Sequence, residues 1–174
     1  MHIVIGLGNP GEEYKNTRHN TGRMAADLLS EKVKDIKVLV PDTFMNKTGP
    51  FVAKAMKGKS AKNLIIIYDD LDLPLGSMKI SFNRSSGGHR GVESIIKALK
   101  TEAFIRIRIG ISPVTPSGKL KKPKGDKDVE KHILTEFKKT EMEIMKKMFK
   151  KSAEAVEMIV EQGLTQAMTE FNSN

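Results

Sequence analysis

The chain has 174 residues, of which 39% are hydrophobic, so it is long enough for one domain with a sizeable core. Its net charge of +9 favours a polyanionic partner, nucleic acid ahead of an anionic membrane surface. It has no cysteine and no apolar run near the ~20 residues of a membrane-spanning helix, which excludes disulfides, cysteine-rich zinc sites, a cysteine nucleophile and a transmembrane segment.

In chain order, the first half predicts strands alternating with helices. Apolar, β-branched runs predict strands at 2–7, 36–40, 64–68 and 78–82, and helical spacing predicts helices at 21–34 and 49–56. The run at 64–68 is continuously apolar, which indicates a central strand covered on both faces. We expect it to end in an acidic turn at 69–76.

The second half predicts a helix at 92–99, a strand at 105–111, a basic loop at 112–126 and a helical C-terminal part. Helices are expected at 129–134, 138–161 and 164–171, the longest with an apolar stripe of Ile144, Met148, Ala155, Met158 and Ile159. The pattern predicts an α/β fold, a single domain over 1–174, with a twisted mixed β-sheet flanked by helices.

Residues 6–11 match the dinucleotide-binding pattern G-x-G-x-x-G directly after a strand. That motif requires a helix to begin at the glycines, facing the pyrophosphate. Here Glu12 and Glu13 follow instead, and the strand at 36–40 ends without a ribose-binding carboxylate. The context therefore argues against dinucleotide binding.

His19, in a polar loop rich in amide side chains, is the natural general base. Asp69, the first polar residue after the central strand, is the leading candidate to orient it, with Asp70 and Asp72 close behind. His89 lies in a glycine-rich loop, where a packing or backbone-bonding role and a direct role are both open. No G-x-S-x-G motif occurs, and we expect no metal site.

Asn9, Asn20 and Asn46 lie near the apolar framework and can hold a carbonyl, a water or a hydroxyl. Positive charge concentrates in 115–151, which holds 12 lysines and 6 acidic residues. A histidine–carboxylate pair with amide donors on a basic scaffold suits attack of water on an ester or amide attached to a polyanion.

Several motifs occur in an order that resembles the bacterial-type peptidyl-tRNA hydrolase family. They lie at 6–11, Tyr14, 17–20 with Gly22, 41–46 with Gly49, 69–74 with Gly76, 87–89 and 104–111. The resemblance implies a monomeric, cytoplasmic α/β enzyme that cleaves the ester between a peptide and the 3′-terminal ribose of tRNA. We expect no cofactor, no metal, no membrane contact and no obligate protein partner.

By motif position, the resemblance makes His19 the general base and Asp69 the residue that orients it, and Asn9 would discriminate a blocked from a free α-amino group. It also implies substrate contacts, to the tRNA or the peptide end, for Tyr14, Phe44, Asn46, Arg90 and Arg108. Arg108 would clamp a tRNA phosphate.

The chain departs from the family pattern in four places. Arg90 replaces a substrate-binding asparagine, and Ser81 replaces a phosphate-clamping lysine, for which Lys79 or Arg84 would compensate. The segment before Ile36 is short, which predicts a smaller sheet edge, and the basic loop at 112–126 is long. These departures keep a rival interpretation open, that of a non-catalytic tRNA-binding or ribosome-binding protein on the same scaffold.

Overall fold

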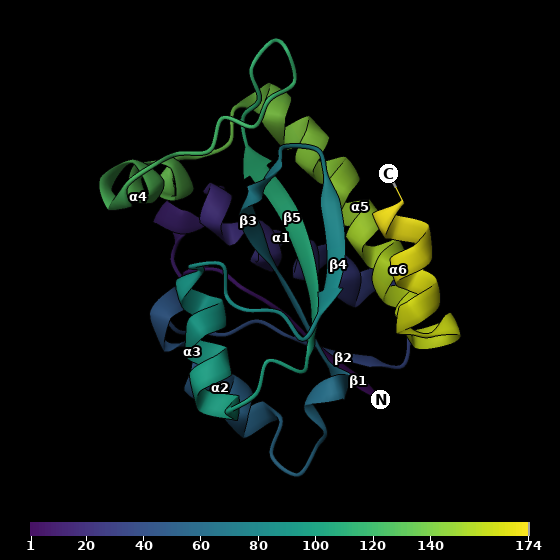
Figure 1. Ribbon diagram of the computed structural model, residues 1–174. Coiled ribbons are helices and arrows are strands. Elements are labelled where there is room, and N and C mark those ends of the chain that lie inside the picture. Colours follow the sequence, from purple (N-terminus) through teal and green to yellow (C-terminus); the bar gives the residue numbers. More distant parts are fainter. Residues whose placement is uncertain (174) are drawn as a thin grey trace.

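A five-stranded sheet with the strand order β2-β1-β3-β5-β4 lies between two layers of helices (Figure 1). The computed structural model describes residues 1–173. The first four strands of this order run parallel and β4 is antiparallel to β5, so the sheet is mixed, as predicted. The strands are β1 (His2–Gly6), β2 (Ile36–Leu39), β3 (Leu64–Pro74), β4 (Met78–Phe82) and β5 (Ile105–Ser112).

All the helices predicted from periodicity are present, each within a few residues of its expected ends. They are α1 (Thr21–Lys32), α2 (Thr48–Ala55), α3 (Arg90–Leu99), α4 (Asp126–Leu134), α5 (Lys139–Gln162) and α6 (Leu164–Asn172). Within residues 1–173, no helix has the length and apolar character needed to cross a bilayer.

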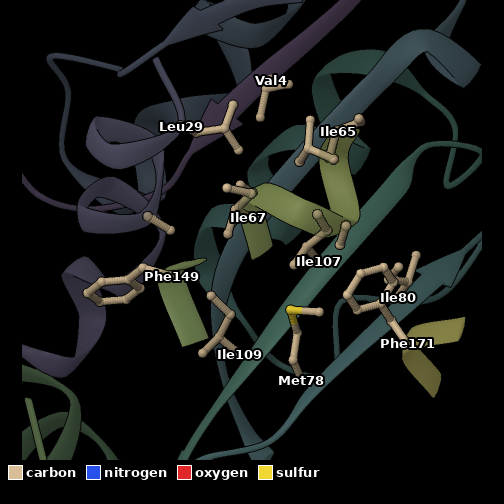
Figure 2. Packing of buried hydrophobic residues seen from close by; sticks show 14 of the residues in the cluster. Val4, Leu29, Ile65, Ile67, Met78, Ile80, Ile107, Ile109, Phe149 and Phe171 are labelled. Carbon is tan, nitrogen blue, oxygen red and sulfur yellow. The ribbon is translucent and has the colours of Figure 1, made fainter. Parts of the chain in front are cut away.

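Two apolar cores form because the side chains of a strand alternate between the faces of the sheet. On one face, α1, α5 and α6 cover residues such as Ile65, Ile67 and Ile107, with Phe149 and Phe171 supplied by the helices (Figure 2). On the other face, α2 and α3 cover a second cluster that includes Ile5, Ile66 and Val92. β3 is therefore buried on both sides, as its unbroken apolar run predicted.

Two glycines allow α1 to lie directly on the sheet. A Cβ at Gly22 would come within 2.0 Å of the Ile67 carbonyl oxygen, and one at Gly6 within 2.1 Å of the Gly22 carbonyl oxygen. This close approach brings the start of α1, and the loop before it, against the ends of β1 and β3. The first glycine of the dinucleotide-like motif thus serves helix–strand packing.

Two details differ from the prediction. β3 does not end before an acidic turn at 69–76: it continues to Pro74 because Asp69, Asp70 and Pro74 still pair with β5, with an irregular register between Asp70 and Pro74. The first half of the α5 stripe is also shifted, since Met145 and Phe149 are buried while Ile144 is exposed. In the second half, Ala155 and Ile159 are buried as predicted.

Candidate active site

The candidate site lies where β1 and the core of β3 reach the carboxyl edge of the sheet. A helical turn at Arg18–Asn20, between β1 and α1, carries His19. Asp69 belongs to β3, fifty residues later, and is fully embedded in the sheet beside Ile109 of β5. The carboxyl edge of a parallel sheet is the usual place for a site in this class of fold.

Three side chains form one hydrogen-bonded cluster. His19 Nδ1 lies 2.8 Å from Asp69 Oδ2, and His89 Nε2 lies 2.9 Å from Asp69 Oδ1. The side chains of His19, Asp69 and His89 are 8%, 2% and 9% exposed. Burial alone would raise the pKa of Asp69, but the adjacent imidazoles, through charge and hydrogen bonds, hold the pKa of that carboxyl well below its usual range.

The hydrogen bonds fix which nitrogen of each histidine carries a proton. The Val92 N–H donates to His89 Nδ1 over 3.3 Å, so His89 Nε2 is the nitrogen that donates to Asp69. The ionised Asp69 accepts from both rings, which makes His19 Nδ1 a donor. The neutral form of His19 therefore has Nε2 as its basic nitrogen.

Asn9 is held by both its backbone and its side chain. Asn20 Oδ1 accepts from the Asn9 N–H, and Asn20 Nδ2 donates to the Asn9 carbonyl, each over 2.9 Å. The Met45 N–H donates to Asn9 Oδ1 over 2.8 Å. This leaves the Asn9 amide nitrogen as a fixed donor beside His19.

A cleft of about 630 Å³ opens over the cluster. His19, Asp69, His89 and Asn9 lie in it, and α4 supplies the wall that includes Val129 and Glu130. Other lining residues come from the segment before α2, from the end of β3 and from the loop before α3: Phe44, Met45, Asn46, Lys47, Asp70, Asp72, Arg84, Ser86 and Arg90. The volume is within the range of ligand-binding clefts.

Most of the predicted substrate contacts line this cleft, and two do not. Phe44, 52% exposed, and Asn46 and Arg90 reach it. Tyr14 is not in the lining and packs edge-to-face against Phe44 at 6.3 Å. Arg108 is buried: its Nε donates to Asp70 Oδ2 over 2.7 Å.

Ser81 is the second partner of Arg108. The guanidinium Nη1 of Arg108 donates to Ser81 Oγ over 3.0 Å. The serine that stands where the family pattern has a basic residue therefore anchors the neighbouring arginine. Lys79, considered as a substitute, donates instead to the Asn172 carbonyl over 2.8 Å.

The C-terminal part braces the histidine loop through Arg18. Arg18 Nη1 donates to the His132 and Thr135 carbonyls, Nη2 donates to Glu141 over 3.1 Å, and the guanidinium lies over the Phe137 ring at 5.6 Å. Sequence reasoning identified neither this brace nor the direct bond of His89 to Asp69. The Gly-Gly-His spacing was the one signal available for His89.

The three clustered groups are also of the kinds that bind metals. The candidate ligand atoms of His19, Asp69 and His89 lie within 4.8 Å of one another. Both Asp69 oxygens already accept imidazole hydrogen bonds, so a metal ion would have to displace two protons and break both bonds. The donor set therefore fits an acid–base cluster better than a metal centre, and metal-free action stays a prediction.

A family model described as "Peptidyl-tRNA hydrolase" matches residues 3–174. The peptidyl-tRNA hydrolase of Fervidobacterium nodosum is 41% identical over 186 residues, covering 98% of this chain and 96% of the relative. That of Pseudothermotoga lettingae is 37% identical over 191 residues, covering 99% and 97%. The crystal structure of the Acinetobacter baumannii enzyme matches with a TM-score of 0.86 at 27% identity, covering 99% of this chain and 95% of that one. The chain belongs to the peptidyl-tRNA hydrolase family.

Proposed function

We propose that this protein hydrolyses the ester bond between a peptide and the 3′-terminal ribose of tRNA, with His19 as the general base. The observation that carries the proposal is the hydrogen-bonded cluster of His19, Asp69 and His89 at the floor of the cleft. Family membership supports the same reaction.

In this mechanism His19 Nε2 takes a proton from a water molecule, and the water oxygen bonds to the ester carbonyl carbon. Asp69 stabilises the imidazolium that forms and keeps the ring in the required orientation. The tetrahedral intermediate then collapses by breaking the bond to the ribose oxygen, which receives the proton from His19. The products are a free peptide carboxyl group and a tRNA with a free 3′ end.

The fixed amide nitrogen of Asn9 is placed to donate to a carbonyl oxygen of the substrate. Because Asn9 Oδ1 already accepts from the Met45 N–H, the amide nitrogen is the group that Asn9 directs to the substrate as a donor. An N-blocked substrate has a peptide carbonyl next to its α-nitrogen, whereas a free aminoacyl group has a charged amine. We therefore assign to Asn9 the discrimination between the two, and to Asn46 a second donor.

The remaining contacts follow from position around the cleft. Phe44, with Tyr14 behind it, offers an aromatic face for a base or an apolar side chain, and Arg90 offers a cation where the family pattern has an asparagine. Arg108 binds a tRNA phosphate only if it exchanges the carboxylate of Asp70 for it. We also propose that the protein acts as a monomer in the cytoplasm, without an obligate protein partner.

The experiment compares two substrates that differ only at the α-nitrogen. The purified protein is expected to cleave N-acetyl-aminoacyl-tRNA and to spare the free aminoacyl-tRNA. The Asn9→Ala variant is expected to have a smaller ratio between the cleavage rates of these two substrates. Release of labelled amino acid measures both rates. Binding of tRNA without cleavage of the N-blocked ester would instead support the non-catalytic tRNA-binding protein.

A further inference from the structure

The exposed face of α5 changes the sign of its charge halfway along the helix. Residues 138–151 hold six lysines and two glutamates, whereas residues 152–162 hold three glutamates and no basic residue. At 100° per residue, Lys139, Lys146, Lys147 and Lys150 fall on the same exposed face as the glutamates that follow. Those glutamates are Glu154, Glu157 and Glu161.

This order of charge only partly follows what a helix favours by itself. Acidic residues stabilise the N-terminal end of a helix and basic residues the C-terminal end; Glu141 in the first turn follows that rule, whereas Lys139 beside it and the lack of a basic residue in the last turn do not. Lysines at 146 and 150, and at 147 and 151, are like charges four residues apart, which repel on a helix surface. In the described part of the chain, none of these lysines forms an ion pair. These lysines therefore present positive charge to a partner outside the helix.

The lysine half of α5 lies at the same end of the molecule as the candidate active site. α5 begins beside the histidine loop, where Glu141 accepts from Arg18, the neighbour of His19. Its other end packs against α6, away from the cleft (Figure 1). Ile144 lies next to the turn at Gly76, which joins β3 to β4 at the carboxyl edge of the sheet.

We propose that the lysine half of α5 (Lys139, Lys146, Lys147 and Lys150) binds phosphates of the double-helical arm of the tRNA, outside the cleft. This inference rests on the proposed function and adds a second contact region to it. The single-stranded 3′ end enters the cleft, and the adjoining duplex then extends along the surface beside it. Lysines one helical turn apart are about 6 Å apart along the axis, a spacing that lets successive lysines reach successive phosphates.

The glutamate half gives this surface a boundary. Glu154, Glu157 and Glu161 repel a phosphate backbone, so RNA is held at the cleft end of α5. With Lys151 and with Glu170 of α6, they line a hollow that shares no residue with the cleft. The change of sign thus sets the position of the duplex along the helix, in addition to its affinity.

The experiment uses the full chain with two substrates. One is N-acetyl-aminoacyl-tRNA, and the other is a short single-stranded oligonucleotide that carries the same 3′-terminal ester but no double helix. The variant is Lys146→Gln/Lys147→Gln/Lys150→Gln. The matched control is Lys54→Gln/Lys57→Gln/Lys59→Gln, which removes the same charge from exposed lysines at the end of α2, near the amino edge of the sheet.

For the tRNA substrate, the α5 variant is expected to raise KM about tenfold at physiological salt, with kcat unchanged. A plot of the logarithm of its tRNA affinity against the logarithm of the salt concentration should have a shallower slope, by the equivalent of up to about three phosphate contacts. For the short substrate, the α5 variant should have the same KM and kcat as the wild type. The control should match the wild type for both substrates.

Three results would overturn the inference while leaving the proposed function standing. They are a tRNA KM for the α5 variant equal to that of the control, an equal loss on the short substrate, and a thermal midpoint below that of the wild type. The last would show that the lysines stabilise the helix, which would explain them without RNA. If the wild type cleaved neither substrate, the proposed function itself would fail.

Discussion

At the residue scale, Asp69 organises the candidate site because both of its oxygens are used. One orients His19 and the other accepts from His89, whose second nitrogen caps α3. Burying an ionised carboxylate costs free energy unless hydrogen bonds or opposite charges compensate for the lost water. Two imidazoles provide those hydrogen bonds to Asp69. The cluster thereby links β3, the histidine loop and the start of α3 into one unit.

Asp69→Asn tests that role directly. The asparagine side chain cannot accept through its amide nitrogen and cannot stabilise an imidazolium charge, so kcat should fall by about 10²–10⁴ with little change in KM. Steady-state hydrolysis of N-acetyl-aminoacyl-tRNA measures both constants. Asp72→Asn is the matched control, because Asp72 lines the cleft but pairs with exposed Lys122. Loss of activity in both variants alike, or in neither, would contradict the assigned role.

At the element scale, α4 forms one wall of the cleft, and hydrogen bonds of His132 and Arg18 help to hold it in place. His132 Nε2 donates to the Ile111 carbonyl at the end of β5 over 2.9 Å. Burial, together with the nearby positive charge of Arg18, lowers the pKa of His132, while the hydrogen bond to Ile111, Glu141 and Asp69 act in the opposite direction. The fold therefore favours neutral His132, the form with one donating and one accepting nitrogen.

This predicts a pH dependence with a definite sign. Because the folded-state pKa of His132 lies below its unfolded value of about 6.5, the unfolded chain binds more protons as the pH falls through that value. The contribution of His132 to the free energy of unfolding is therefore fully present above pH ~6.5 and is lost progressively below it. Because the group is only half-buried, the loss is less than about 1.4 kcal/mol per pH unit.

His132→Gln, which keeps a donor for the Ile111 carbonyl, isolates this contribution. The free energy of unfolding, measured by urea denaturation between pH 7.5 and 5, should fall less steeply for this variant than for the wild type. Identical slopes for the two proteins would show that His132 does not titrate in the predicted sense.

At the scale of the whole molecule, the sequence predicted most of the framework and part of the site. The continuous apolar run of β3 and the alternation of Ile and Arg in β5 identified these strands. The alternation in β5 marks the two faces of the strand, although both faces are buried and its arginines lie inside. The end of β3 was missed because Asp69 and Asp70 are polar yet still pair with β5, and polarity alone does not reveal pairing. The first half of the α5 stripe was misplaced by one residue because apolar residues flank the buried face there, whereas Ala155 and Ile159 were placed correctly.

The contacts that no local pattern can specify are those between distant segments. The bonds of Arg18 to His132, Thr135 and Glu141 span more than a hundred residues of sequence. The salt bridge that occupies Arg108 likewise depends on which strands are neighbours in the sheet. The family motifs pointed to Asp69 as the partner of His19, whereas the position of the three aspartates after the strand left Asp70 and Asp72 as alternatives.

In the proposed function, the basic surface binds tRNA and one histidine, His19, carries out the chemistry. The most direct measurement is hydrolysis of N-acetyl-aminoacyl-tRNA by His19→Ala, with tRNA affinity determined on the same preparation. His2→Ala, at the amino end of β1, is the control. We predict that His19→Ala reduces kcat by at least about 10²–10⁴ while it binds tRNA as the wild type does. Near-normal turnover by His19→Ala would contradict the account.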